Sequence, residues 1–360
     1  MTIEIPSHPR GFDEITVRGA GVFGLAIAFE CARRGAKVRV IETARIGAGS
    51  SGGHVGALAP HVPENWNPKK AFQLESLLMA QGFWDAVREI GGGDAGYGRV
   101  GRIQPLKDEA AIALARARGE GAKALWQGQA VWEIREVAEF GAFVPPSPTG
   151  LVIYDTLSAR AAPRAAAHAL AAAIRALGGE ILLGDHPDRG IVIHATGAEG
   201  LRALSEDFGK PVGQGIKGQS ALLDGTGLAG LRSAPQVYTD SLHIIGHADG
   251  TIAIGSTTEH EFDDPSSTDA SLEALIAKAR ALCPALIDAP VIDRWAGARP
   301  RAKTRAPMLG AWPDRDGHFI ANGGFKIGFG MAPKVAATMA DLVLEGMNTI
   351  PEGFHVTDNL

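Results

Sequence analysis

Residues 15–42 read ITVRGAGVFGLAIAFECARRGAKVRVIE, and this stretch decides the fold of the chain. It opens with the β-like run 15–18 and continues with apolar residues at helical spacing up to Ala32. A second β-like run, 37–41, follows a glycine and ends at Glu42. A strand, a helix and a strand within about 30 residues predict a βαβ unit, whose two strands are parallel.

A glycine-rich turn joins the first strand to the helix. Gly19, Gly21 and Gly24 form a GxGxxG pattern, which allows a tight turn, backbone access to a pyrophosphate, and close helix–strand packing, in that order. The start of the helix favours an anion through its free N–H groups and its dipole. Glu42 is placed to accept hydrogen bonds from an adenosine ribose, which suits FAD or NAD rather than NADP.

The GxGxxG pattern alone is a weak signal, because this chain contains it three times. It recurs at 213–218 and at 225–230. Neither of these copies lies between a clear strand and a helix with an acidic strand end beyond it. The sequence context therefore places the nucleotide site at the first copy.

Length and composition predict a folded globular protein with two domains. At 360 residues it exceeds the size at which one core keeps growing, and 45% hydrophobic with 21% charged residues is ordinary for a globular protein. Two isolated cysteines are too few for a disulfide framework or a metal knuckle. The net charge of −5 disfavours nucleic acid, and no secretory signal or membrane span is recognised. We expect a cytoplasmic protein, and the sequence sets no oligomeric state.

Hydrophobic periodicity predicts further elements along the chain. Helices are expected at 70–90, 163–177, 270–282 and from Pro333 to Leu344, and strands at 180–183, 191–195 and 318–321. Residues 220–255 alternate and turn repeatedly, which predicts an antiparallel sheet.

Several further motifs give the chain a resemblance to the FAD-dependent D-amino acid oxidase and glycine oxidase superfamily. They are GSSGGHVGALAP (49–60), ATG (195–197), IKGQ (216–219), TIAIGSTTE (251–259), GARP (297–300) and GGFKIGFGMAP (323–333). The likeness covers most of the chain and implies FAD as the cofactor. No cysteine matches the position at which some sarcosine-oxidising relatives attach flavin, so we expect FAD to be bound without a covalent bond.

The resemblance implies an α/β fold with two interleaved domains. A Rossmann-like FAD-binding domain with a parallel central sheet would comprise residues 1–75, 150–212 and 290–360. An α+β substrate domain with an antiparallel sheet would comprise residues 76–149 and 213–289.

A flavin ring must lie where backbone N–H groups can contact its polar edge, and glycine-rich segments permit this. The final helix would direct its N-terminus at the pyrimidine end of the ring. The residues expected to bind the cofactor are Gly19, Gly21, Val22, Phe23, Gly24, Glu42, Thr43, Ser50, Ser51, Gly56, Ala57, Leu58, Thr196, Gly197, Gly324, Phe325, Lys326, Ile327 and Gly328.

On the substrate side, the resemblance implies that Arg299 of the G-x-R-P motif binds a carboxylate, which its planar fork suits. Lys326 and His243 are the other expected active-site residues, and His54 and His61 are weaker candidates. The alternatives are an arginine in a surface salt bridge, a solvated lysine and structural histidines.

The predicted activity is oxidation of a small amine or amino acid by hydride transfer to flavin N5, with an imine that hydrolyses and with O2 or another acceptor taking the electrons. The basic residues Arg299, Arg301, Lys303 and Arg305 form either a solvated face or a site for an acidic substrate. The alternatives for the whole chain are an NAD-dependent dehydrogenase, a non-catalytic flavin-binding module, and an oxidase of a carboxymethylamino-modified tRNA nucleoside. The last is suggested by a likeness of 47–87 to an enzyme that modifies wobble uridine, and the acidic composition disfavours it.

Overall fold

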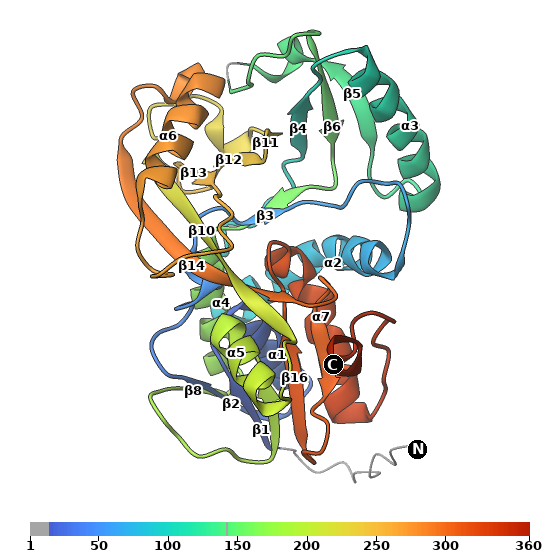
Figure 1. The fold of residues 1–360 in the computed structure, drawn as a ribbon, viewed down its shortest axis with the longest axis vertical. Helices are drawn as coiled ribbons and strands as arrows, with labels where there is room; N and C mark the ends of the chain where they lie inside the picture. The colour runs from blue at the N-terminus through green and yellow to red at the C-terminus, as the bar shows by residue number, and fades with distance from the viewer. Residues whose placement is uncertain (1–13, 142) are drawn as a thin grey trace.

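The computed structural model describes residues 14–141 and 143–360 of the chain. Two large sheets lie at opposite ends of the elongated molecule, and two long strands run between them (Figure 1). Within the part of the chain that is described, no helix is long and apolar enough to cross a membrane.

The first sheet has six strands and contains the predicted βαβ unit. Its order is β15 (Met308–Ala311), β16 (His318–Asn322), β9 (Ile191–His194), β1 (Glu14–Arg18), β2 (Lys37–Glu42) and β8 (Glu180–Leu183). All neighbours are parallel except β15 and β16. Helix α1 (Val22–Arg33) packs against α4 (Pro163–Ala176) and α7 (Gly328–Glu345), and its apolar residues are buried in the largest core.

The second sheet has eight strands. Its order is β14 (Val291–Ala302), β10 (Gly213–Asp224), β13 (Thr251–Gly255), β12 (Leu242–Gly246), β11 (Gln236–Thr239), β4 (Arg102–Pro105), β6 (Leu151–Asp155) and β5 (Trp132–Glu136). Only β11 and β4 pair in parallel. Helix α6 (Ala270–Leu282) packs on β10 and β13 over a separate core, and α3 (Glu109–Trp126) packs on β5.

Strands β10 and β14 form an antiparallel ribbon of 12 residues each, which reaches from the eight-stranded sheet to the six-stranded one (Figure 1). In its register Ile216 faces Arg299 and Gly218 faces Gly297. Helix α5 (Gly197–Asp207) packs on both strands. Helix α2 (Pro68–Gly91) and the strand pair β3 (Ala57–Leu58) and β7 (Ala159–Arg160) lie between the two ends.

The predicted fold class is confirmed: a parallel Rossmann-like sheet with helices is combined with a mainly antiparallel second sheet. The helix expected at 270–282 and the strand expected at 180–183 coincide with α6 and β8. The alternating region 220–255 does form antiparallel strands.

The prediction that Pro333 opens the last helix was wrong. Helix α7 begins at Gly328, and Pro333 lies inside it. Gly328 and Gly330 have low helix propensity, so the sequence pattern did not indicate that the helix begins before Pro333. Because proline has no N–H, the carbonyl of Phe329, four residues earlier, receives no helical hydrogen bond from position 333.

Two strands lie on the other side of the expected domain boundaries. Strand β6 begins at Leu151 and pairs with β4 and β5, although residues from 150 were expected in the FAD-binding domain. Strand β14 begins at Val291 and pairs with β10, although residues from 290 were expected there too. Helix α2 likewise crosses the boundary at 75. Turn signals marked where the chain reverses, but the sheet that a strand joins depends on distant partners. The division into two domains stays a prediction.

Candidate active site

The glycine turn between β1 and α1 shows why three glycines are needed. Gly19 has φ 106°, and a Cβ there would lie 2.4 Å from the carbonyl oxygen of Ala195. A Cβ on Gly24 would lie 2.0 Å from the carbonyl oxygen of Gly19. A Cβ on Gly21 would meet only Ser51 Oγ, at 3.4 Å. The protein's own packing therefore requires the first and third glycines, whereas the second keeps open the space beside the helix start.

A cavity of about 700 Å³ begins at this turn. Glu42 lines it, and its carboxylate is fixed by the N–H groups of Ala20 at 2.9 Å and Ala44 at 3.0 Å. The first-turn N–H groups of α1 have no intrahelical partner, so they can bind an anion at this end. Val22 N–H is an exception, because it donates to Ser51 Oγ at 2.9 Å.

A second cavity, of about 210 Å³, adjoins the first. The residues that line both are Val22, Ser50, Ser51, Phe325 and Gly328. Together the two cavities extend from Glu42 to Arg299. The length of the two cavities and the open space beside Gly21 suit an extended dinucleotide.

Most of the residues expected to bind the cofactor line one of these two cavities. Those in the first are Gly19, Gly21, Val22, Phe23, Glu42, Thr43, Ser50, Ser51, Thr196, Gly197, Gly324, Phe325 and Gly328, and those added by the second are Gly56, Ala57 and Lys326. Gly24, Leu58 and Ile327 line neither. Gly24 serves helix packing, and Leu58 is a fully buried core residue.

Arg299 lies in the second cavity and is buried, with 8% of its surface exposed. Its Nη1 donates to Ser256 Oγ at 2.6 Å, and its Nη2 donates to the carbonyl of Thr257 at 2.6 Å. None of its hydrogen-bond acceptors among the described residues is a carboxylate, and its Nε has no described partner. Burial lowers the pKa of Arg299 to about 10, so the group remains charged at neutral pH.

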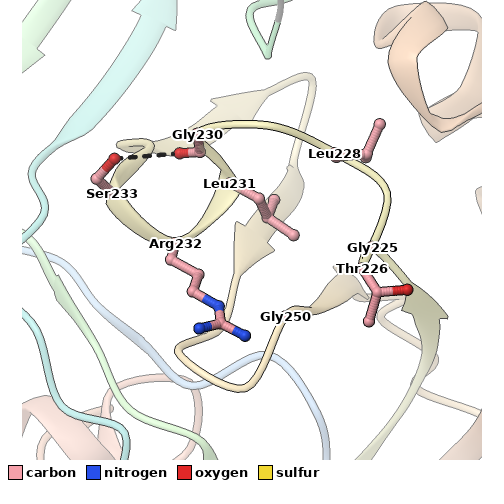
Figure 2. Close-up of a pocket in the computed structure, with 8 residues that line it drawn as sticks. All are labelled: Gly225, Thr226, Leu228, Gly230, Leu231, Arg232, Ser233 and Gly250. Atoms are coloured by element: carbon pink, nitrogen blue, oxygen red, sulfur yellow. Dashed lines mark hydrogen bonds between the residues drawn. The ribbon is translucent and has the colours of Figure 1, made fainter.

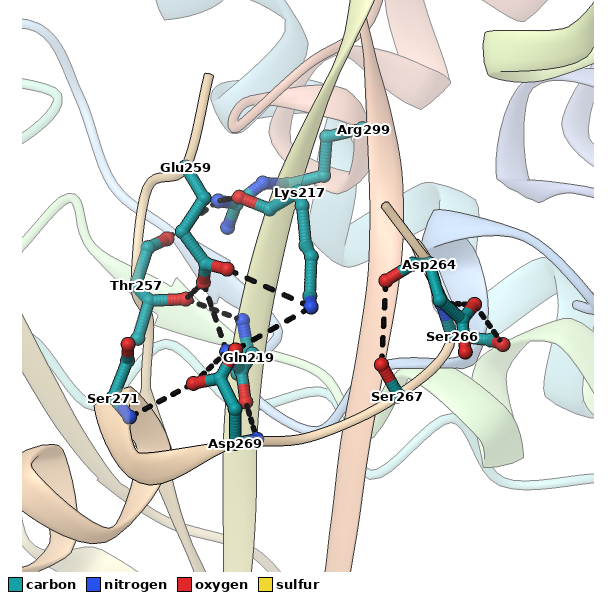
Figure 3. Close-up of polar contacts among 10 residues, drawn as sticks. All are labelled: Lys217, Gln219, Thr257, Glu259, Asp264, Ser266, Ser267, Asp269, Ser271 and Arg299. Carbon is teal, nitrogen blue, oxygen red and sulfur yellow. Dashed lines mark hydrogen bonds and ion pairs between the residues drawn. The ribbon is translucent and has the colours of Figure 1, made fainter. Parts of the chain in front are cut away.

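A polar network around the buried Lys217 and Gln219 holds the segment that carries these acceptors (Figure 3). Gln219 is fully buried, and its Nε2 donates to Glu259 at 3.0 Å and to Asp269 at 2.9 Å. Its backbone N–H donates to Thr257 Oγ1 at 2.8 Å, and Thr257 Oγ1 donates to Glu259. Lys217 lies between the two carboxylates, with N–O distances of 3.7 and 3.6 Å. The orientation of Arg299 therefore depends on strand β10 and on the cap of α6.

Lys326 lies beside Arg299 in the same cavity, and its Nζ donates to Thr258 Oγ1 at 2.8 Å. Burial and the Arg299 charge lower the pKa of Lys326. Arg299, Arg301 and Lys326 all place their charges within 6 Å of the Phe325 ring centre.

Of the basic cluster expected to bind an acidic substrate, only Arg299 lines the cavity, and Arg301 adjoins it at Phe325. Lys303 and Arg305 are exposed and line neither cavity. These two residues therefore belong to a solvated face.

His243 lines the second cavity next to Tyr238, with the ring centres 4.6 Å apart. Burial lowers the pKa of His243 to about 3, so its imidazole is neutral. Its Nδ1 has no partner among the residues that the structure describes. Two cations, Arg299 and Lys326, and two imidazoles, His243 and His54, line the cavity, and no described Asp or Glu lines it.

His54 and His61 are separated by the structure. His54 lines the second cavity, whereas His61 binds Gln73 and lines neither cavity. Sequence patterns indicate His54 only weakly and do not indicate Ser256 or Trp295, which also line the second cavity. They come from separate segments, so only the folded chain brings them together.

The two other GxGxxG copies have no place in the nucleotide site. Gly213, Gly215 and Gly218 lie within strand β10. Figure 2 shows that the copy at 225–230 forms a loop around a separate hollow with Gly250 and Arg232. The first copy alone lies between a strand and a helix, as expected from its context.

The family described as FAD dependent oxidoreductase (DAO) matches residues 14–342. The chain belongs to this family. FAD is therefore its cofactor, and the NAD-dependent alternative is set aside. Neither of the two cysteines of this FAD-dependent oxidoreductase lines a cavity, since both are buried elsewhere in the described chain.

Known proteins are similar over nearly the whole length. The glycine oxidase of Pseudomonas aeruginosa is 26% identical, over 92% of this chain and 94% of that protein. The solved glycine oxidase of Geobacillus kaustophilus has a TM-score of 0.81 at 21% identity, covering 96% of this chain and 98% of that one. The iminodiacetate oxidase of Chelativorans sp. BNC1 has a TM-score of 0.80 at 20% identity, covering 95% and 98%. The two solved structures support the fold.

Proposed function

We propose that this FAD-dependent oxidoreductase oxidises the C–N bond of a small amino acid or a related amine, whose carboxylate binds Arg299. One observation carries the proposal: Arg299 is a buried cation in a cavity that no described acidic residue lines. A buried cation whose hydrogen-bond acceptors are all neutral is costly, so an anionic ligand is a suitable complement. The likeness to glycine oxidases and to an iminodiacetate oxidase supports a substrate that carries both an amine and a carboxylate.

The residues of the chain would bind and orient this substrate. Ser256 and Thr257 hold the Arg299 guanidinium, which can offer a carboxylate two parallel charge-assisted hydrogen bonds. Lys326 adds a second positive charge, and the neutral His243 offers a free nitrogen to a polar substrate group. The glycine turn at Gly19 would hold FAD without a covalent bond. When bound, the flavin supplies the acceptor for the Cα hydride and is reoxidised by O2 or another acceptor. Orientation would provide most of the rate enhancement.

An anaerobic screen of amino acids and small amines tests this function. At least one amino acid is expected to bleach the flavin. The imine should hydrolyse, and the resulting carbonyl compound should be detected. Arg299→Lys should strongly weaken binding of this substrate, because a single ammonium group cannot reproduce the bidentate geometry of the guanidinium. Lys303→Ala is the control, since it removes an exposed charge of the same cluster. A flavin that stays oxidised with every compound, as in a non-catalytic flavoprotein, would overturn the proposal.

A further inference from the structure

Three side chains in hydrogen-bond contact, Ser220, His54 and Asp293, connect the second cavity with the surface. Ser220 Oγ lies 3.2 Å from His54 Nδ1, and His54 Nε2 lies 3.1 Å from Asp293 Oδ2. The three residues come from the glycine-rich segment, from β10 and from β14, so that 166 and 239 positions separate His54 from the other two. Such contacts bring a hydroxyl, an imidazole and a carboxylate into one hydrogen-bonded line.

The two ends of this line lie in different surroundings. Ser220 and His54 are 1% and 3% exposed, and both line the cavity that contains Arg299. The side chain of Asp293 is 39% exposed. The line therefore runs from the buried Arg299 cavity to solvent.

The charges around His54 allow it to accept a proton. Burial lowers the pKa of His54, which outweighs the effect of the Asp293 hydrogen bond, so the imidazole is neutral at neutral pH. Asp293 faces it as an anion, held by Arg164 Nη1 at 2.6 Å. His247 contacts the His54 carbonyl through Nε2 at 2.8 Å. The charged or titratable groups that share the cavity with His54 are Arg299, Lys326, His243 and Tyr238.

Oxidation of an amino acid has a step for which no residue has been assigned above. At neutral pH the substrate amine is an ammonium ion, and its Cα hydride can leave only when a nitrogen lone pair is available to form the imine. The cationic Arg299 and Lys326 cannot accept the ammonium proton. This step requires a base whose pKa lies near the operating pH. The base must reach the substrate amine directly or through one hydroxyl group.

We propose that His54 is this base and acts through Ser220, an assignment that rests on the proposed function. The ammonium N–H proton passes to Ser220 Oγ while the Ser220 O–H proton passes to His54 Nδ1. The substrate thus loses one proton, the imidazole gains one, and Ser220 is unchanged. Asp293 accepts a hydrogen bond from Nε2–H and stabilises the imidazolium, which returns its extra Nδ1 proton to water once the product has left. No electrons move in this step.

The pH profile of anaerobic flavin reduction tests the assignment. In the wild type, the rate should fall on acidification as His54 becomes protonated. His54→Gln keeps hydrogen-bonding groups but cannot accept a proton, so reduction at pH 7 should slow on the order of 100-fold. The rate should then rise with pH towards the alkaline pKa of the free amine. His61→Gln, which alters a histidine outside both cavities, should keep the wild-type profile.

Titration of the histidine ring signals by NMR in the holoenzyme gives a readout without turnover. Asp293→Asn should lower the pKa of His54 and move the acid limb of the rate profile in the same direction, even if His54→Gln fails to fold. An unchanged rate profile in both variants, with wild-type bleaching intact, would overturn the assignment of His54 alone. Absence of bleaching in the wild type would overturn the proposed function, and the base with it.

Discussion

Gly218→Ala is expected to displace Arg299 while leaving the fold intact. A Cβ at position 218 would lie 2.2 Å from Nη2 and 2.5 Å from Nη1 of Arg299. Non-bonded atoms of this kind normally approach to about 3.5 Å, so the guanidinium must move by about 1 Å. It is the end of a flexible side chain, and Gly218 has an ordinary strand conformation. The strain can therefore be relieved without moving the backbone.

Gly218→Ala should weaken carboxylate binding much more than it lowers the stability of the fold. A displacement of about 1 Å from a bidentate geometry costs on the order of 100-fold in binding or rate. The weakened hydrogen bonds to Ser256 and Thr257 should lower the free energy of unfolding by about 1–2 kcal/mol. The preference of strands for alanine over glycine offsets this by about 0.5–1 kcal/mol.

Acetate binding, followed through the visible spectrum of the bound flavin, measures the first effect without turnover. Urea unfolding measures the second. The matched control is Gly227→Ala, because a Cβ there meets nothing within 4 Å. If Gly218→Ala bound acetate as tightly as the wild type, Arg299 would not be the carboxylate site, and the argument from its buried charge would fail.

Three further predictions concern the network, the glycine turn and pH. Thr257→Val keeps the side-chain shape but removes the hydroxyl that connects this segment to the polar network around Gln219. The affinity for acetate should fall about tenfold. In an Arg299→Ala background the same change should leave acetate affinity unaltered, which a double-mutant cycle measures. Gly21→Ala should weaken FAD binding in a flavin titration with little loss of stability, whereas Gly24→Ala should destabilise the protein by more than about 2 kcal/mol in urea unfolding, because its Cβ meets backbone. Burial lowers the pKa of His194 to about 4, so the unfolded state binds the proton more readily, and stability present above about pH 6.5 should decline towards pH 4 by up to about 1.4 kcal/mol per pH unit. With FAD saturating, His194→Gln should flatten this slope, and an unchanged slope would contradict the assignment.

Local sequence predicted what local interactions determine. The strand before Gly19, the helix after it and the acid at Glu42 follow from spacing and turn chemistry over about 30 residues. Helix α6 has the bounds that were predicted, and the structure shows that Asp269 caps its start through Ser271 N–H.

Contacts between distant segments were beyond such reasoning. Strand β6 resembles any short apolar run, and only its pairing with β4 and β5 assigns it to the larger sheet. His54 was only a weak candidate from its place in the glycine-rich motif, because Ser220 and Asp293 approach it only after folding. Gly218 looked like part of an accidental repeat, yet it is the position where the Arg299 guanidinium lies against the strand.

The pairing of β10 with β14 limits how an enzyme of this design can change. Side chains alternate between faces along a strand, so a register slip of one residue between Gly218 and Arg299 would place the two on opposite faces of the ribbon. New substrate preferences can therefore arise by exchanging single residues on the ribbon or by lengthening the loops at its ends. A one-residue change of register between Gly218 and Arg299 would instead remove Arg299 from the second cavity.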